Sequence, residues 1–234
     1  MNLPPAIWVV LPVYDEAAAI RGVIEEWVRT LRKLDAPFVI MAINDGSTDA
    51  TAAMLDALPF PEVRVWHRTN VGHGQSCRFG YETAVAEQAE WVLQLDSDGQ
   101  CDPAFIARFW AARSTGPVIL GCRVRRDDGI VRWLISRVVS LVVFLHTGRW
   151  IKDANVPYRL MRADRLRAAL PRLPERAFFT NILLSCLLAE DICWIPIRFR
   201  QRAGGRSAIK LRAMIRLAGR LSRELRQLKH EKAF

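Results

Sequence analysis

The first 120 residues alternate short apolar runs with longer amphipathic segments, and this alternation constrains the fold more than any other feature of the sequence. Runs that are apolar throughout are typical of strands covered on both faces, and the segments between them carry apolar residues at helical spacing. This order predicts an α/β fold with a mostly parallel sheet and helices on both faces. The expected strands are 7–11, 38–43, 63–66, 91–95 and 118–120, and the expected helices are 16–34, 49–58, 74–87 and 103–113.

Polar residues follow each expected strand, at the point where the strand ends. In open α/β sheets, ligands bind outside the carboxyl ends of the strands, so these segments are the expected functional region. Capped turns explain any one of them, but they explain all five together poorly. The segments are 12–16, 44–49, 70–74, 96–100 and 121–123.

Asp96 and Asp98 stand two residues apart at the end of an expected strand, so both carboxylates point to the same side. Hard oxygen ligands of this kind suit Mg²⁺ or Mn²⁺ that carries substrate phosphates, and Gln100 adds a neutral oxygen. The alternative is a capped turn before the helix at Pro103, and both interpretations stay open.

Two further loops also have both a functional and a structural interpretation. The segment 45–49 offers carboxylates and hydroxyls to a base or a ribose, and a helix N-cap in the same loop is compatible with that role. The glycines of 72–74 do not form a dinucleotide fingerprint, because the third glycine of that pattern is replaced by Cys77 and the loop follows the third strand. A nicotinamide cofactor is therefore disfavoured.

Charge divides the chain into two unlike halves. Residues 1–120 contain nine Lys and Arg against 15 Asp and Glu, whereas residues 121–234 contain 25 against nine. The basic excess indicates an anionic partner, which can be nucleic acid, a membrane surface or phosphate. Nucleic acid ranks low, because the helical repeat of the tail contains no aromatic residues for base stacking.

The back half contains two helical patterns. Residues 130–146 are apolar nearly all round and include Arg137, which predicts a helix lying partly in the membrane interface; a core helix with a surface arginine is the alternative. Residues 208–234 predict a basic amphipathic helix suited to anionic lipid, or one packed on the domain or on a second subunit. We therefore divide the chain into a catalytic domain, 1–207, and this C-terminal helix.

The compartment follows from cysteines and from the absence of long apolar segments. Five cysteines without a CxxC pair indicate neither a disulfide framework nor a zinc site, which favours a reducing compartment. The N-terminus lacks the basic region of a signal peptide, and no apolar stretch reaches the ~20 residues of a spanning helix. We expect a protein that is cytoplasmic and peripheral on the cytoplasmic face of the membrane.

Taken in order, these motifs resemble those of inverting family 2 glycosyltransferases of the GT-A fold, and within that family the polyprenyl-phosphate (dolichol-phosphate-like) sugar synthases. The resemblance covers roughly residues 7–210. Asp15 replaces the usual Asn, and Val-Pro-Tyr at 156–158 replaces Ser-Gly-Phe near the expected acceptor site. The matching segments are 12–16 (PVYDE), 44–49 (NDGSTD), 70–74 (NVGHG), 96–100 (DSDGQ), 121–123 (GCR) and 153–162 (DANVPYRLMR).

The resemblance implies roles for individual residues. A nucleotide sugar would contact a set of residues from the strand ends and from a loop near 202–207, namely Pro12, Tyr14, Glu16, Asp45, Ser47, Asp96, Arg202 and Ser207. The metal ligands would be Asp96, Asp98 and Gln100. The residues expected to take part in catalysis, three of them by holding phosphates, are Asp98, Arg123, Arg137 and Arg159.

The implied reaction is the metal-dependent transfer of a sugar from GDP-mannose or a UDP-hexose to a membrane polyprenyl phosphate. A phosphate monoester has a second pKa of about 6, so the acceptor is largely dianionic at neutral pH and needs no enzymatic base. Two alternatives remain: a different lipid or glycan acceptor, or a catalytically silent nucleotide-sugar-binding subunit that recruits an integral membrane partner. A homodimer is a further arrangement compatible with the tail.

Overall fold

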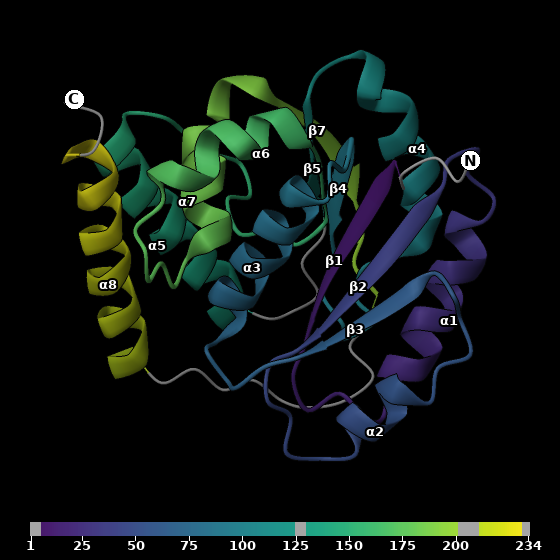
Figure 1. Cartoon of the computed structure of the whole chain (residues 1–234). Helices are drawn as coiled ribbons and strands as arrows, with labels where there is room; N and C mark the ends of the chain where they lie inside the picture. Colours follow the sequence, from purple (N-terminus) through teal and green to yellow (C-terminus); the bar gives the residue numbers. More distant parts are fainter. Residues whose placement is uncertain (1–5, 125–129, 201–210, 231–234) are drawn as a thin grey trace.

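The computed structural model contains a seven-stranded mixed sheet with helices on both faces (Figure 1). The structure describes residues 6–124, 130–200 and 211–230, and of 130–136, 211–215 and 229–230 it describes only the helical backbone. The strands are β1 (Ile7–Val13), β2 (Phe38–Asn44), β3 (Val63–His67), β4 (Trp91–Gln94), β5 (Val118–Arg123), β6 (Arg159–Arg162) and β7 (Ile192–Ile197). Their order in the sheet is β3-β2-β1-β4-β6-β5-β7.

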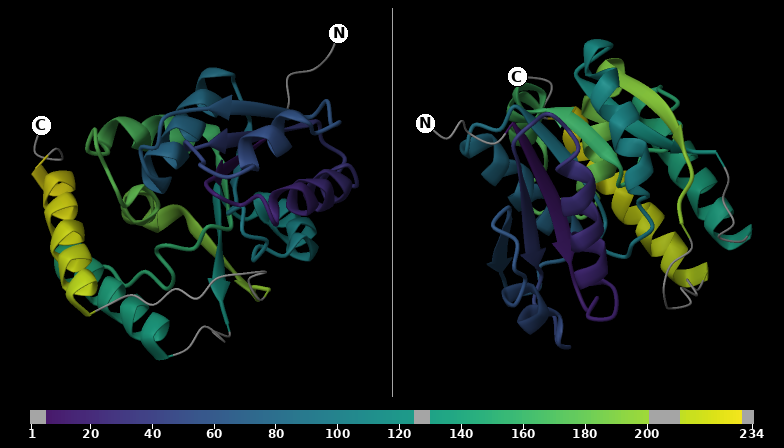
Figure 2. Two further views of the ribbon diagram at one scale, coloured as in Figure 1. Left: turned by 90° about the horizontal axis from the view of Figure 1, so that it is seen from below. Right: turned by 90° about the vertical axis from the view of Figure 1, so that its right-hand side faces the viewer.

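The helices form three groups in Figure 1. One face of the sheet is covered by α1 (Ile20–Leu31), α2 (Thr51–Asp56) and α4 (Ile106–Ala111), and the other by α3 (His73–Ala86), α6 (Ala163–Ala169) and α7 (Thr180–Leu187). The third group, α5 (Ile130–Thr147) and α8 (Leu211–His230), lies side by side beyond α7, as Figure 2 also shows. The predicted α/β fold with helices on both faces is confirmed.

Local sequence explains the front half of this arrangement. All seven residues of β1 are buried, because helices cover both faces of the sheet. In α1, the buried residues Ile20, Ile24, Trp27 and Leu31 recur every three or four positions and form the face that packs on the core. The helix begins at Ile20 and not at residue 16; residues 17–19 form a turn, in which the Glu16 carbonyl accepts from the amides of Ala19 and Ile20.

The back half departs from a simple repeat of strand and helix. Strand β6 is inserted antiparallel between β4 and β5, whereas every other neighbouring pair is parallel. The apolar stretch 178–197 is divided into α7 and β7 by a 3₁₀ turn, Ala189–Asp191. Across the described ranges, no helix is both long enough and apolar enough to cross a bilayer.

The sheet opens between β1 and β4, and this opening positions the site. The chain runs outward from β1 to β3 and then returns to the other side of β1 as β4, so the strand order reverses here. Pairing of the two strands ends at Val10 and Gln94. Amide directions alternate along a strand, and since the Ile7 amide faces β2, the nitrogen of Pro12 faces the opened side, where a missing N–H costs no ladder bond.

Candidate functional site

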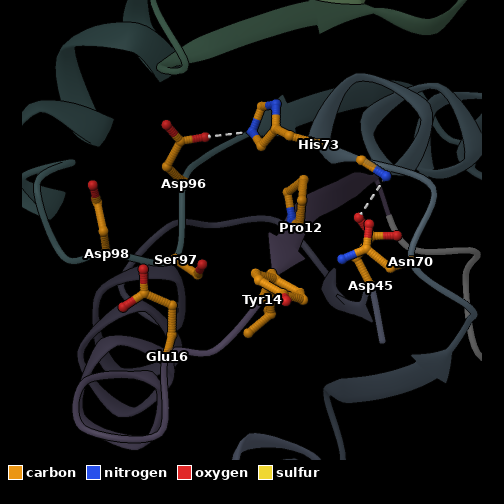
Figure 3. Close-up of a pocket in the computed structure, with 11 residues that line it drawn as sticks. Pro12, Tyr14, Glu16, Asp45, Asn70, His73, Asp96, Ser97 and Asp98 are labelled. Carbon is orange, nitrogen blue, oxygen red and sulfur yellow. Dashed lines mark hydrogen bonds and ion pairs between the residues drawn. The ribbon is translucent and has the colours of Figure 1, made fainter. Parts of the chain in front are cut away.

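A pocket of about 280 Å³ lies at this opening (Figure 3). Asp96 and Asp98 stand on one side of it and Asp45 and Asn70 on the other, with Pro12 between them. The lining residues come from the end of β1 and from the segments after the first four strands: Pro12, Val13, Tyr14, Glu16, Asp45, Asn70, Gly72, His73, Asp96, Ser97 and Asp98. Six residues expected to bind donor or metal are therefore brought together, namely Pro12, Tyr14, Glu16, Asp45, Asp96 and Asp98.

The loops after β1 and β2 hold each other by hydrogen bonds. The amide of Asp15 donates to Ser47 Oγ at 3.1 Å, and the amide of Glu16 donates to Thr51 Oγ1 at 2.9 Å. In return, Asp15 Oδ1 accepts from the amide of Thr48 at 2.7 Å. Ser47 does not line the pocket, so its position indicates a role in holding the loop beside Tyr14 and Glu16.

Asp45 joins the second loop to the third. Its carboxylate is buried, and its two oxygens accept from the amides of Val71 at 3.0 Å and Gly72 at 2.9 Å. Gly46 has a φ of +72°, and a Cβ at this position would lie 2.7 Å from the amide nitrogen of Asn70. Only glycine permits this close approach, which brings Asn70 to the wall of the pocket.

His73 contacts Asp96, the first of the three expected metal ligands. Its Nε2 lies 3.0 Å from Oδ1 of Asp96, whose side chain is 34% exposed. The neighbouring Cys77 thiol and the Asp96 carboxylate raise the pKa of His73 well above its usual value, although burial acts in the opposite direction. Burial alone would raise the pKa of Asp96, but the charge of His73 and hydrogen bonds from His73 and Gln94 lower it overall, which favours the carboxylate form.

Asp98 and Gln100 lie in different surroundings. Asp98 lines the pocket, and its Oδ1 accepts from the amide of Gln100 at 3.0 Å. The side chain of Gln100 does not line the pocket and donates through Nε2 to the carbonyl of Arg200 at 3.3 Å. The structure therefore brings Asp96 and Asp98 into the pocket, and it places the third expected ligand beside the segment that follows β7.

The carboxylates of Asp96 and Asp98 are the side chains of the pocket that can hold a divalent cation. Within the described ranges, no group of three or more His, Cys, Asp and Glu side chains is arranged to hold a metal. His73 and Gln94 both donate to Oδ1 of Asp96, so neither bond occupies Oδ2. Two carboxylates completed by substrate phosphates and water are a usual environment for Mg²⁺, so the residues fit a cation that arrives with its substrate.

Arg123 is held by the carboxylate of Asp153, which was not among the expected site residues. Its Nε and Nη2 each donate to Asp153 at 2.7 Å, and Asp153 is almost fully buried. The guanidinium also lies 5.3 Å from the centre of the Phe199 ring. Arg123 is the last residue of β5, which runs in the same direction as β4, so it lies at the same end of the sheet as the pocket. Its charge contributes to lowering the pKa of Asp96.

Arg159 does not occupy the position expected for a residue that holds a phosphate. It is 0% exposed, and its guanidinium donates to the carbonyls of Val156 and Ala154 at 2.6 Å and to Ser185 Oγ at 3.0 Å. These internal acceptors account for the buried charge, so the position supports a structural role and not the expected contact with lipid phosphate. Burial lowers the pKa of Arg159.

The altered segment 156–158, which the resemblance implies to lie near the acceptor site, is packed in the core. Val156 and Tyr158 are fully buried, and the Tyr158 ring stacks on Phe109 with 4.3 Å between centroids. The replacement of the usual residues here is therefore a change in core packing and carries no argument about the acceptor.

The remaining expected residues lie away from the pocket or outside the described residues. Arg137 is exposed on α5 and does not line the pocket. Arg202 and Ser207 lie outside the described residues. Sequence reasoning missed His73 and Asp153 as site residues. His73 could have been identified as a site residue from its position among the polar residues after the third strand.

Solved structures with the same fold include two phosphoglycerate-linked sugar synthases. Glucosyl-3-phosphoglycerate synthase from Mycobacterium tuberculosis, in complex with Mn²⁺, uridine diphosphate and glucosyl-3-phosphoglycerate, is 20% identical, with a TM-score of 0.66 over 97% of this chain and 79% of that one. Mannosyl-3-phosphoglycerate synthase from Rubrobacter xylanophilus is 14% identical, with a TM-score of 0.68 over 98% and 76%. At these identities the likeness shows the fold alone, and it is the expected GT-A fold.

Curated relatives from Pectobacterium, Proteus, Serratia, Yersinia and Pseudomonas share one name, undecaprenyl-phosphate 4-deoxy-4-formamido-L-arabinose transferase. The protein of Pectobacterium atrosepticum is 30% identical over 214 residues, which are 89% of this chain and 64% of the relative. That of Pseudomonas paraeruginosa is 30% identical over 215 residues, with 89% and 62% covered. The chain thus spans less than two thirds of the length of these relatives. The model of glycosyl transferase family 2 matches residues 8–168, more than half of the chain, and the chain belongs to this family.

Proposed function

We propose that the protein is a metal-dependent inverting glycosyltransferase that moves a sugar from a nucleotide diphosphate sugar to a polyprenyl phosphate. The observation that carries the proposal is the pocket at the reversal of strand order, in a member of glycosyl transferase family 2; its lining includes Tyr14, Glu16, Asp45, Asp96 and Asp98. The proposed acceptor class, a polyprenyl phosphate, follows the names of the curated relatives, which include undecaprenyl phosphate.

The pocket offers distinct surroundings to the two ends of a donor. Pro12, Tyr14, Glu16 and Asp45 supply an aromatic ring, an apolar ring and carboxylates to the nucleoside. At the other end, α3 begins at His73, and this residue and the N-cap Gly72 line the pocket. The positive end of a helix dipole and its unpaired amides favour an anion, so we propose that the diphosphate lies between this helix and Asp96.

We propose that Asp96 and Asp98 hold Mg²⁺ or Mn²⁺ together with the diphosphate. Two carboxylates fit either cation, and the solved synthase from Mycobacterium tuberculosis contains Mn²⁺ with uridine diphosphate. When bound, the cation would supply positive charge that stabilises the departing diphosphate. Gln100 would contribute only through its contact with the loop, because its side chain is turned to Arg200.

The proposed reaction needs no protein nucleophile. An oxygen of the lipid phosphate forms a bond to the anomeric carbon while the bond from that carbon to the diphosphate oxygen breaks, and the nucleoside diphosphate leaves with the electron pair. Attack from the opposite side inverts the configuration. Bringing two phosphates together is the electrostatic problem, and we propose that Arg123 and Arg137 reduce the repulsion at the acceptor. Arg159 would only support the strand beneath.

The acceptor is a membrane lipid, and the outer helices offer a surface that suits one. Five apolar side chains on and just after α5 are 37–69% exposed, and we call them the α5 ridge: Val138, Leu141, Phe144, Leu145 and Trp150. Exposed arginines of α8, which packs beside α5, are Arg216, Arg220, Arg223 and Arg226. Apolar insertion combined with basic charge favours an anionic lipid surface, so we propose peripheral membrane binding through the ridge.

We propose that the protein works at the cytoplasmic face of the membrane, a reducing compartment in which cysteines remain thiols; its five cysteines are not joined by disulfides.

The experiment that tests the function is a panel of labelled UDP- and GDP-sugars incubated with undecaprenyl phosphate and either Mg²⁺ or Mn²⁺, with the product extracted into organic solvent. We expect one donor to give a lipid-linked sugar. Asp98→Asn should lower turnover by about 100-fold or more, because the variant loses one charge at the metal. Asp56→Asn, which alters an exposed carboxylate on α2, is the matched control and should change turnover less than twofold.

The results separate this proposal from its alternatives. Transfer to a glycan or a different lipid, with no product on polyprenyl phosphate, would contradict the acceptor assignment. Donor binding without transfer to any acceptor would indicate a catalytically silent subunit. Equal turnover by Asp98→Asn and the unaltered protein would contradict the metal site.

A further inference from the structure

A chain of buried polar side chains runs from α3 and α7 through β4 to the expected metal ligand Asp96. The hydroxyl of Tyr81 donates to Asn181 Oδ1 at 2.7 Å, and Asn181 Nδ2 donates to Gln94 Oε1 at 3.0 Å. Gln94 Nε2 then donates to Asp96 Oδ1 at 3.2 Å. Tyr81 and Gln94 are 0% exposed and Asn181 is 4% exposed, so these polar groups depend on one another for partners.

The direction of every bond in this chain is determined by its last member. An ionised carboxylate only accepts hydrogen bonds, so Gln94 has to present its amide nitrogen to Asp96 and its oxygen to Asn181. Asn181 must then donate to Gln94, and its own oxygen is left to accept from the Tyr81 hydroxyl. Three donors in succession therefore point toward the carboxylate, an arrangement that strengthens each bond in a low-dielectric interior.

The chain meets Asp96 at a single oxygen. Gln94 and His73 both contact Oδ1, one from the strand below and one from the first turn of α3. Two donors at one oxygen restrict rotation of the carboxylate about its Cβ–Cγ bond, and neither of them occupies Oδ2. A cation would meet an oxygen whose direction is already determined, and less orientational freedom would be lost on binding.

The far end of the chain is attached to a rigid junction between two helices. The hydroxyl of Thr180, the first residue of α7, donates to the carbonyl of Gly74 in α3 at 2.7 Å. A Cβ on Gly74 would lie 2.1 Å from the carbonyl oxygen of Phe178, so the helices approach as closely as glycine allows. Asn181 follows Thr180 directly, and its position is therefore tied to the turn that carries His73.

We propose that Gln94, Asn181 and Tyr81 are positioning residues that set the orientation of the Asp96 carboxylate for a divalent cation. The inference rests on the proposed function, because it takes Asp96 as a metal ligand. None of the three residues lines the pocket, so each acts through Asp96 and not on the substrate.

The first experiment measures Mn²⁺ binding by electron paramagnetic resonance in the presence of UDP and, in a second series, of GDP. Gln94→Leu and Asn181→Leu should weaken Mn²⁺ binding by about tenfold or more, as replacement of the residues that support metal ligands does. Tyr81→Phe, which removes only the most distant hydroxyl, should weaken it less. The thermal midpoint of each variant, measured in parallel, establishes that the protein tested is folded.

Ser185→Ala is the matched control. Ser185 lies one turn beyond Asn181 and is equally buried; it bonds to Arg159 and to the backbone carbonyls of Ala154 and Asn181, but to none of the side chains of the donor chain that ends at Asp96. It should lower stability without weakening Mn²⁺ binding by more than twofold. Unchanged Mn²⁺ binding in folded Gln94→Leu, or equal weakening in Ser185→Ala, would overturn the proposal.

A second measurement separates this inference from the proposed function. Crystal structures of the unaltered protein and of Gln94→Leu, both grown without metal, compare the side-chain torsion angles of Asp96. We expect the carboxylate to rotate or to occupy two orientations in the variant, and an unmoved carboxylate would overturn the positioning role. If the unaltered protein binds no Mn²⁺ but the carboxylate still rotates in the variant, the metal assignment fails and the positioning role stands.

Discussion

Tyr158 and Arg159 are neighbours that enter the same core with opposite outcomes for their polar atoms. The guanidinium of Arg159 finds three acceptors within the fold. The ring of Tyr158 packs against Phe109 and, edge-on at 5.8 Å, against Trp27, but its buried hydroxyl has no hydrogen-bond partner among the residues that the structure describes. A buried hydroxyl without a partner lost its bonds to water on folding and gained none in return.

We therefore expect Tyr158→Phe to be more stable than the unaltered protein. Removing the unpaired hydroxyl should raise the free energy of unfolding by about 1 kcal/mol, measured by urea denaturation. Tyr81→Phe is the control, because it removes an equally buried hydroxyl that donates to Asn181, and it should be destabilising. If both variants lose stability alike, Tyr158 has a partner that the described residues do not supply.

At the scale of elements, α8 is built into the fold through both an apolar and a polar contact. Leu221, Leu225 and Leu228 are buried, so this part of its apolar face packs on the protein and is not available to lipid. Glu224 accepts from the amides of Phe178 and Phe179 at 3.1 Å, where α7 begins. Of the two arrangements expected for the tail, the described part of α8 shows packing on the domain.

Glu224→Gln should weaken this attachment. The substitution keeps the size of the side chain but presents an amide NH₂ group to backbone N–H donors, so at least one buried hydrogen bond is lost. We expect the free energy of unfolding to fall by about 2 kcal/mol, the range for buried hydrogen bonds to a charged group. Glu175→Gln, at an exposed position on the preceding loop, should leave the urea midpoint unchanged.

At the scale of the whole molecule, apolar surface and positive charge lie on the same side. The α5 ridge is exposed although α5 also packs against α8, where His146 Nε2 lies 2.9 Å from Ser222 Oγ. The Phe144 and Trp150 rings contact each other edge to face, with centroids 6.1 Å apart. Tryptophan favours the level of lipid headgroups, so this cluster suits the boundary of a bilayer.

The double variant Leu141→Glu with Leu145→Glu tests the proposed membrane contact. Binding to vesicles that contain phosphatidylglycerol, measured by sedimentation at low salt, should fall by about tenfold or more, since two apolar anchors are lost and two negative charges approach an anionic surface. Ala53→Glu with Ala57→Glu adds the same charge to exposed positions on and directly after α2, away from α5 and α8, and should bind nearly as the unaltered protein does. Equal loss in both pairs would show that net charge alone governs binding.

The pattern of apolar and polar residues is enough to predict the strands and helices of the front half and the polar residues at the strand ends. All five expected strands and the helices between them are present, because periodicity of apolar residues reports which side chains are buried. Tyr14, Glu16, Asp45, Asp96 and Asp98 meet in one pocket for a related reason: parallel strands end at the same edge of a sheet.

The remaining features, which are strand pairing and the partners of individual side chains, depend on contacts between distant parts of the chain. The antiparallel insertion of β6 depends on pairing with distant strands, which local periodicity does not encode. Arg159 reads in the sequence like any other arginine, yet its acceptors come from a neighbouring loop and from α7. Likewise, an amphipathic repeat shows that α8 has an apolar face but not what covers it. The periodicity of apolar residues shows which side chains are buried, whereas the residues that each of them contacts are determined only when the chain folds.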